Sequence, residues 1–146
     1  MNDRFKFRAW WKPNYREPIM LYDVEKTYDF MRGKPESICA DCFGEVLEDK
    51  DYIVMQCTGM KDKNGKLIYE GDIVRFTEYE IDEVEPEWEY TTIVWGGDHD
   101  YPAFDLKTHE FDCNGLSEIF NVGYTIEVCG NIYENAEKIR EVLDEK

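Results

Sequence analysis

Apolar and charged side chains alternate at the start of the chain, which is the pattern of a half-buried β-strand. Residues 4–9 read Arg-Phe-Lys-Phe-Arg-Ala, with the apolar side chains at every second position. A turn at Pro13-Asn14 separates this strand from a second predicted strand at residues 19–22. Residues 32–50 contain Gly33, Pro35 and Gly44 among several charges, and they predict a loop or an insertion.

Strands joined by short turns also account for the middle of the chain. Residues 52–58 form an apolar run, and the Asn64-Gly65 pair after it predicts a type I′ hairpin turn, because both residue types tolerate positive φ. A second turn at residues 70–72 leads into a strand at 73–76. β-Branched and aromatic side chains predict further strands at residues 91–95, 104–106 and 125–129.

The segment from residue 78 to residue 90 alternates as well, but it is strongly acidic. Its apolar positions change from odd to even numbers at Asp82-Glu83, so a bulge or a turn is expected there. Pro86 cannot donate a ladder hydrogen bond, which places the predicted strand at the edge of a sheet. Seven carboxylates between Glu78 and Glu89 would protect that edge from pairing with other chains.

Clear helical periodicity occurs only at the C-terminus. Ala136, Ile139, Val142 and Leu143 recur on one face, and Asn135 is a suitable N-cap, so a short helix is predicted over residues 135–145. Residues 115–123 are ambiguous, and at most one helical turn is expected there. The pattern therefore predicts a mainly β protein with one closing helix.

Composition narrows the functional class. The 146 residues include 17 basic and 33 acidic side chains, a net charge of −16, which argues against a general binder of nucleic-acid phosphates. The segment from Phe76 to Leu106 holds ten carboxylates and no Lys or Arg, whereas residues 1–35 carry a net positive charge. This asymmetry serves either solubility or charge-steered association. The sequence shows neither a signal-peptide pattern nor an apolar run long enough to span a membrane.

Five cysteines cannot all pair within one chain, so reduced thiols are expected. Cys39 and Cys42 form the one CxxC pair, but a structural zinc site needs four ligands, so these two are weak metal candidates and we predict no metal site. His99 lies between Asp98 and Asp100, but no nucleophile motif or metal motif accompanies it or His109. We therefore predict no catalytic residue, no cofactor and no enzymatic activity.

One long motif is similar to a known family. Residues 55–74, MQCTGMKDKNGKLIYEGDIV, resemble the core motif of the YopX family, small proteins of phages and prophages, and residues 6–10, 93–95 and 130–135 support the resemblance. The resemblance implies an N-terminal β subdomain, assigned to residues 1–50 with the insertion at 32–50, packed on a C-terminal β-barrel-like domain at residues 51–146. It implies no activity. The acidic segment and the CxxC pair lie outside the resemblance.

These observations lead to two functional hypotheses. The first is a non-catalytic binding module with a macromolecular partner, expected to be a protein, in the cytoplasm of a bacterial host. The alternative is an acidic nucleic-acid mimic that inhibits a host DNA-binding enzyme, in which Glu85, Glu87 and Glu89 imitate phosphates on a strand face. Neither hypothesis involves direct nucleic-acid binding or a membrane. We also expect residues 1–31 to dock against the C-terminal domain, and the sequence leaves a homo-oligomer open.

Overall fold

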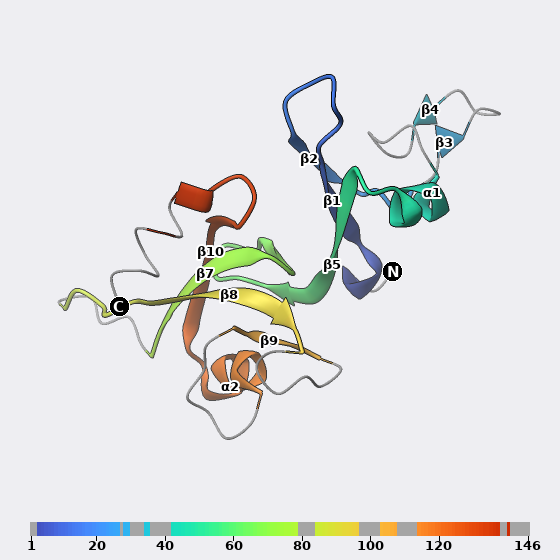
Figure 1. The fold of residues 1–146 in the computed structure, drawn as a ribbon. Coiled ribbons are helices and arrows are strands. Elements are labelled where there is room, and N and C mark those ends of the chain that lie inside the picture. Colours follow the sequence, from blue (N-terminus) through green and yellow to red (C-terminus); the bar gives the residue numbers. More distant parts are fainter. Residues whose placement is uncertain are drawn as a thin grey trace. The chain divides into compact units, whose positions relative to one another are not determined.

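The computed structural model describes residues 3–26, 28–29, 34–35, 42–78, 84–96, 103–107, 114–137 and 140. The chain forms two compact units, Met1–Gly59 and Met60–Lys146 (Figure 1). The sheets of both units are antiparallel, so the predicted mainly β fold is confirmed. A helix is predicted at residues 135–145, and residues 136, 137 and 140 are helical. Residues 138, 139 and 141–145 lie outside the described residues.

The first unit is built around β1 (Phe7–Trp11), which lies between β2 (Ile19–Tyr22) and β5 (Tyr52–Lys61). A short 3-10 helix, η1 (Asp3–Phe5), precedes β1, and β3 (Tyr28–Asp29) pairs with β4 (Lys34–Pro35). The core of this unit consists of small and branched side chains from β1, β2 and the segments around them: Ala9, Leu21, Val24 and Val46.

Residues 43–48 correct the loop prediction for 32–50, because they form a helix, α1 (Phe43–Glu48). Val46 is buried in the core, and the ring of Phe43 lies 4.9 Å from that of Phe7. Six residues are too few to show helical periodicity, and Gly44 disfavours a helix on intrinsic propensity. Burial of Val46 and Phe43 against β1 explains why the helix forms here nevertheless.

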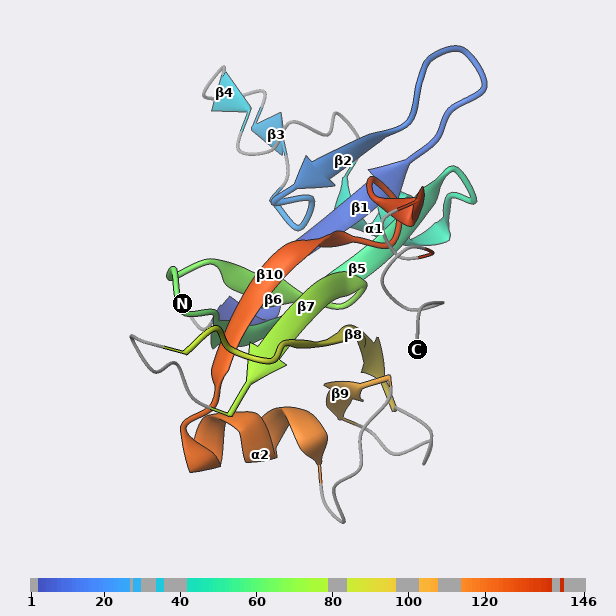
Figure 2. The same ribbon diagram turned by 90° about the vertical axis from the view of Figure 1, so that its left-hand side faces the viewer.

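The second unit contains a four-stranded sheet in the order β10-β7-β8-β9, which curls into a half-barrel (Figure 2). Its strands are β7 (Asp72–Thr77), β8 (Glu89–Trp95), β9 (Phe104–Leu106) and β10 (Thr125–Asn131). An additional short strand, β6 (Leu67–Tyr69), pairs with β5. Helix α2 (Gly115–Val122) contacts β9 and is longer than the single turn that the sequence suggested.

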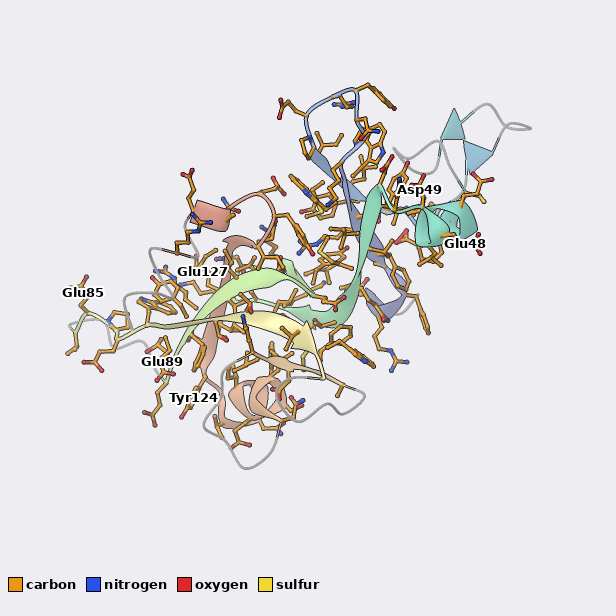
Figure 3. The ribbon with its side chains drawn as sticks, viewed as in Figure 1. Glu48, Asp49, Glu85, Glu89, Tyr124 and Glu127 are labelled. Carbon is orange, nitrogen blue, oxygen red and sulfur yellow. The ribbon has the colours of Figure 1, made fainter. Side chains whose placement is uncertain are left out.

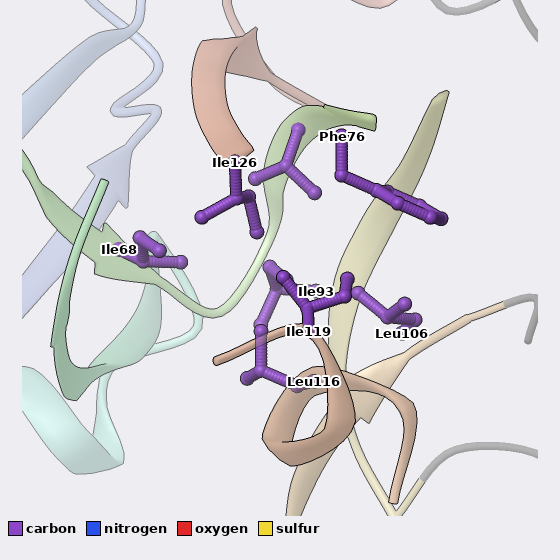
Figure 4. Close-up of a cluster of buried hydrophobic side chains, with 8 residues drawn as sticks. Ile68, Phe76, Ile93, Leu106, Leu116, Ile119 and Ile126 are labelled. Carbon is purple, nitrogen blue, oxygen red and sulfur yellow. The ribbon is translucent and has the colours of Figure 1, made fainter. Parts of the chain in front are cut away.

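The buried core of the second unit joins α2 to the sheet (Figure 4). All of its members are aliphatic or aromatic, and they come from the five strands β6 to β10 and from α2: Ile68, Val74, Phe76, Ile93, Leu106, Leu116, Ile119 and Ile126. This core fixes the end of β7 and the helix that leads into β10. Both elements contribute side chains to the site described below.

The boundary between the two units falls inside β5, immediately after Gly59, whereas the predicted boundary lies after residue 50. The first half of β5 pairs with β1 from Tyr52 to Gln56, which explains why it belongs to the first unit. Gly59 has a φ of +84°, a backbone conformation that residues other than glycine rarely adopt. Gly59 thus gives β5 a positive φ inside the strand, at the boundary between the two units.

The type I′ turn predicted at Asn64-Gly65 is wrong. Gly65 has a φ of +79°, but Asn64 does not have positive φ, and a type I′ turn requires it at both residues. The loop instead has the pairing of a three-residue hairpin, in which the N–H of Asp62 donates to Lys66 and that of Gly65 donates to Asp62. The Asp62 carboxylate accepts the N–H groups of Asn64 and Lys66, which accounts for the different geometry.

Candidate functional site

The candidate site is a groove in the second unit, with a cavity volume of about 750 Å³. This volume lies within the usual range for ligand sites. The groove lies where β7 ends, where β8 begins and where α2 leads into β10. Its lining residues come from these three segments: Phe76, Thr77, Glu78, Val84, Glu85, Pro86, Glu87, Trp88, Glu89 and Tyr124.

Backbone structure explains why these segments meet. Phe76 and Glu89 are partners in the β7–β8 ladder, so the ends of both strands lie side by side. The ladder strand begins only at Glu89, and residues 85–88 before it belong to no strand, which corrects the longer edge strand predicted there. Pro86 contributes to this, since it has no N–H to donate. The phase change predicted at Asp82-Glu83 lies outside the described residues.

Tyr124 also lines the groove, although it lies in a distant part of the sequence, between α2 and β10. Helix α2 ends at Gly123, which adopts the left-handed conformation with a φ of 80°. The next N–H, that of Tyr124, donates to the carbonyl of Ile119 at 2.9 Å, and the chain then continues into β10. Figure 3 shows Tyr124 and Glu89 near each other, with Glu85 farther out along the segment before β8.

Two cations of the same unit lie over the ring of Trp88. The guanidinium of Arg75 lies 4.1 Å from the ring centroid of Trp88, and the ammonium of Lys63 lies 5.6 Å from it. Arg75 is fixed in turn by Glu127, because its Nε and Nη2 both donate to one carboxylate oxygen, at 2.9 and 2.7 Å. The hydrogen bond with Glu127 raises the pKa of Arg75 above its ordinary value. Trp88 is therefore a positioned aromatic wall of the groove.

The groove is negatively charged. Glu78, Glu85, Glu87 and Glu89 are exposed at its rim. Partial burial raises the pKa of Tyr124 above its ordinary value of 10.0, and the negative charges of Glu78, Glu118 and Glu89 raise it further. A tyrosine with the ordinary pKa is already protonated at neutral pH, and both effects act in the same direction, so the groove presents a neutral phenol among carboxylates.

This electrostatic picture makes a direct prediction. We expect the double variant Glu78→Gln/Glu89→Gln to lower the pKa of Tyr124, but not back to 10.0, because burial and the negative charge of Glu118 still raise it. The measurement is a pH titration of carbon-13 labelled tyrosine by NMR, with Tyr124→Phe used to assign the signal. Glu48→Gln, an exposed position in the other unit, is the control and should leave the titration unchanged. An unchanged pKa in the double variant would contradict the assigned cause.

The residues singled out from the sequence have different outcomes. Glu85, Glu87 and Glu89 line the groove together, beside Trp88, which the sequence analysis did not single out. Cys42 is an exposed free thiol in the first unit, whereas Cys39 lies outside the described residues, as do His99 and His109. Within the described ranges, no three or more His, Cys, Asp and Glu side chains are grouped in a way that could hold a metal ion.

Sequence reasoning missed Tyr124 and the support of Trp88 by Arg75. Tyr124 is 36 residues from Trp88 in the numbering of the chain, and no local pattern links the two. Arg75 offers a weak signal, since it is the last cation before the segment that holds only carboxylates. Pairing of β7 with both β8 and β10 is what brings the three residues to one place.

Comparisons with known proteins agree with the fold. The family model described as YopX protein matches residues 6–140, a range that includes every residue of the groove. The crystal structure of protein EF1440 from Enterococcus faecalis is similar to this chain, with a TM-score of 0.55 and 25% sequence identity over 92% of this chain and 96% of that one. No curated protein matches the chain. Among the helices in the described part, none has the length and apolar character to cross a bilayer.

Proposed function

The chain belongs to the YopX family, and we propose that it is a phage- or prophage-encoded accessory protein that acts in the cytoplasm of a bacterial host as a non-catalytic binding module. The groove is the observation that carries this proposal. It combines a volume suited to recognition with aromatic walls and an exposed charged rim, which are features of protein contact surfaces. The partner in this proposal is a protein.

The rigidity of the groove supports a role in recognition. Arg75 links Trp88 to Glu127 on β10, so the aromatic wall keeps its orientation before any partner arrives. A preorganised aromatic side chain loses little conformational entropy on binding. Val84, with 61% of its surface exposed, adds an apolar contact point at the rim.

The geometry favours this proposal over a nucleic-acid mimic. A mimic needs carboxylates in a regular ladder at phosphate-like intervals. Glu85 and Glu87 instead lie before the start of β8, and they line a concave surface together with Trp88 and Tyr124. A concave, partly apolar surface fits an inserted side chain better than it fits a DNA-binding face.

The proposal is tested by affinity capture with a matched pair of variants. Tagged wild-type chain, Glu85→Gln/Glu87→Gln and Glu48→Gln/Asp49→Asn are expressed in lysogenic bacteria, and the captured proteins are identified by mass spectrometry. The second variant removes the same number of charges from α1 and its C-terminal cap, which belong to the first unit, whereas the groove residues belong to the second. We expect at least one protein that the wild type and the α1 variant retain and the groove variant loses.

Two outcomes would overturn the proposal. If every captured protein is retained by the groove variant, the groove is not the contact surface. If the wild type inhibits a host nuclease, and the groove variant loses that inhibition without losing any other partner, the mimic hypothesis replaces the binding module. Rebinding of the purified partner to the purified chain completes a positive result.

A further inference from the structure

We propose that the groove binds an arginine-containing basic segment of a partner protein, an inference that rests on the proposed binding function and names the chemistry of its ligand. The first reason is charge. The segment from Phe76 to Leu106 has no Lys or Arg, and four of its carboxylates line the groove: Glu78, Glu85, Glu87 and Glu89. Across the described part of the chain, no cation forms an ion pair with any of these four.

The second reason is the shape of the charged surface. Glu85, Glu87 and Glu89 occupy every second position of the segment that leads into β8, and within the described residues no three or more such side chains are grouped closely enough to hold a metal ion. A row of separated carboxylates complements a row of separated cations better than it complements a single ion. An extended peptide with several basic side chains provides such a row.

The third reason is the aromatic lining, which selects arginine over lysine. A guanidinium is planar and weakly hydrated, so it can stack on an aromatic ring and donate to a carboxylate at the same time. Trp88 already takes the guanidinium of Arg75 at 4.1 Å, while Glu127 takes the donors of that same group. The ammonium of Lys63 lies farther from the same ring, at 5.6 Å, so the guanidinium makes the closer of these two contacts. Arg75 with Trp88 and Glu127 is thus an example of the arrangement proposed for the partner, with Glu85, Glu87 or Glu89 in the place of Glu127.

Other ligand classes fit the groove less well. Phosphate groups of nucleic acids or lipid surfaces would be repelled by the rim carboxylates. A purely apolar peptide would leave those carboxylates without compensation at a closed interface, which is costly. A basic segment that also carries aliphatic side chains satisfies both parts of the groove, since Val84 and Pro86 offer apolar surface beside the charges.

The test uses short synthetic peptides labelled with fluorescein, in which arginine alternates with alanine and leucine. Matched peptides replace arginine with lysine or with glutamine. Binding is measured by fluorescence polarisation to the full chain at low and high salt. We expect the arginine peptide to bind about threefold more tightly than the lysine peptide, and the glutamine peptide not to bind. Affinity should fall as salt rises, because the rim charges are exposed.

Variants locate the binding site. We expect Glu85→Gln/Glu87→Gln to weaken binding of the arginine peptide about five- to tenfold, because two exposed charge pairs with the peptide are lost. Glu48→Gln/Asp49→Asn has the same net charge and should keep the wild-type affinity within about twofold. Trp88→Phe should reduce the preference for arginine over lysine, because phenylalanine is the weaker cation–π partner.

The outcomes separate this inference from the proposed function. If the groove variant loses a protein partner but the arginine peptide does not bind, the binding function stands and the basic-segment inference is overturned. If the groove and α1 variants weaken the peptide equally, binding reflects overall charge and the inference also fails. If neither the peptide nor any partner responds to the groove variant, both proposals are wrong.

Discussion

Replacing Asp105 with alanine is expected to destabilise the second unit by about 3–4 kcal/mol. Asp105 is fully buried in β9, and its Oδ1 accepts the N–H groups of Leu106, Gly115 and Leu116 at 2.8, 2.9 and 3.3 Å. Two of these donors are the first residues of α2, which the helix itself leaves without acceptors. Each buried donor left without an acceptor costs about 1–3 kcal/mol.

The measurement is urea unfolding of the full chain, followed by tryptophan fluorescence. A background with Trp10→Phe and Trp11→Phe restricts the signal to Trp88 and Trp95 in the second unit. Asp105→Asn is the matched control, since it keeps an oxygen at the Oδ1 position and removes the charge. It should cost about 1–2 kcal/mol, in the range of one weakened hydrogen bond to a charged group. Equal losses in both variants would show that the charge matters and the acceptor geometry does not.

The strands were predictable because their cause is local. Side chains in β1, β7, β8 and β10 alternate, or are β-branched and aromatic, over windows of five to seven residues. The two central helices were not predictable in the same way. Six and eight residues give too few turns for a periodic pattern, and both helices depend on tertiary contacts for their stability.

Alternation was less reliable for the charged positions within strands. Arg8 was expected to face outward with the other cations of residues 4–9, but it is 2% exposed. Asp62, Asp72 and Asp105 counted only as negative charge in the sequence, yet all three are buried and accept backbone N–H groups. Sequence shows that a residue carries charge. It does not show whether several backbone donors converge on that charge, since the donors come from segments brought together by the fold.

The charge of the groove could be predicted from the sequence, but its aromatic residues could not. The acidic rim follows from composition, because a run of carboxylates without cations is visible in the chain. The contribution of Tyr124 to the groove and the contact of Arg75 with Trp88 depend on the pairing of β7 with both β8 and β10. Accordingly, the sequence alone supported two different uses of the same carboxylates, as a guarded edge or as a phosphate mimic. The concave arrangement adds a third use, recognition of a basic segment.

Asp62 carries the second large stability prediction, because its carboxylate connects two separate parts of the second unit. Its Oδ1 accepts the N–H groups of Asn64 and Lys66, each at 2.9 Å, and its Oδ2 accepts that of Val128 in β10 at 3.0 Å. The residue is only 7% exposed. The loop also reaches β10 through its backbone, since the N–H of Lys63 donates to Ile126 at 2.9 Å. Asp62 thus fixes both the shape of the loop and its attachment to the sheet.

We expect Asp62→Ala to cost about 2–3 kcal/mol in the same unfolding assay. The loss is smaller than for Asp105, because Asn64 and Lys66 are exposed and water can replace the acceptor for their N–H groups. Asp62→Asn separates the two roles, since one oxygen remains for the loop or for β10, but not for both. The stability of Asp62→Asn should lie between those of the wild type and Asp62→Ala. Amide hydrogen exchange should become faster at Val128 or at Lys66, whichever N–H loses its acceptor. Unchanged exchange at both amides, together with wild-type stability, would mean that the backbone contact of Lys63 alone holds the loop on β10.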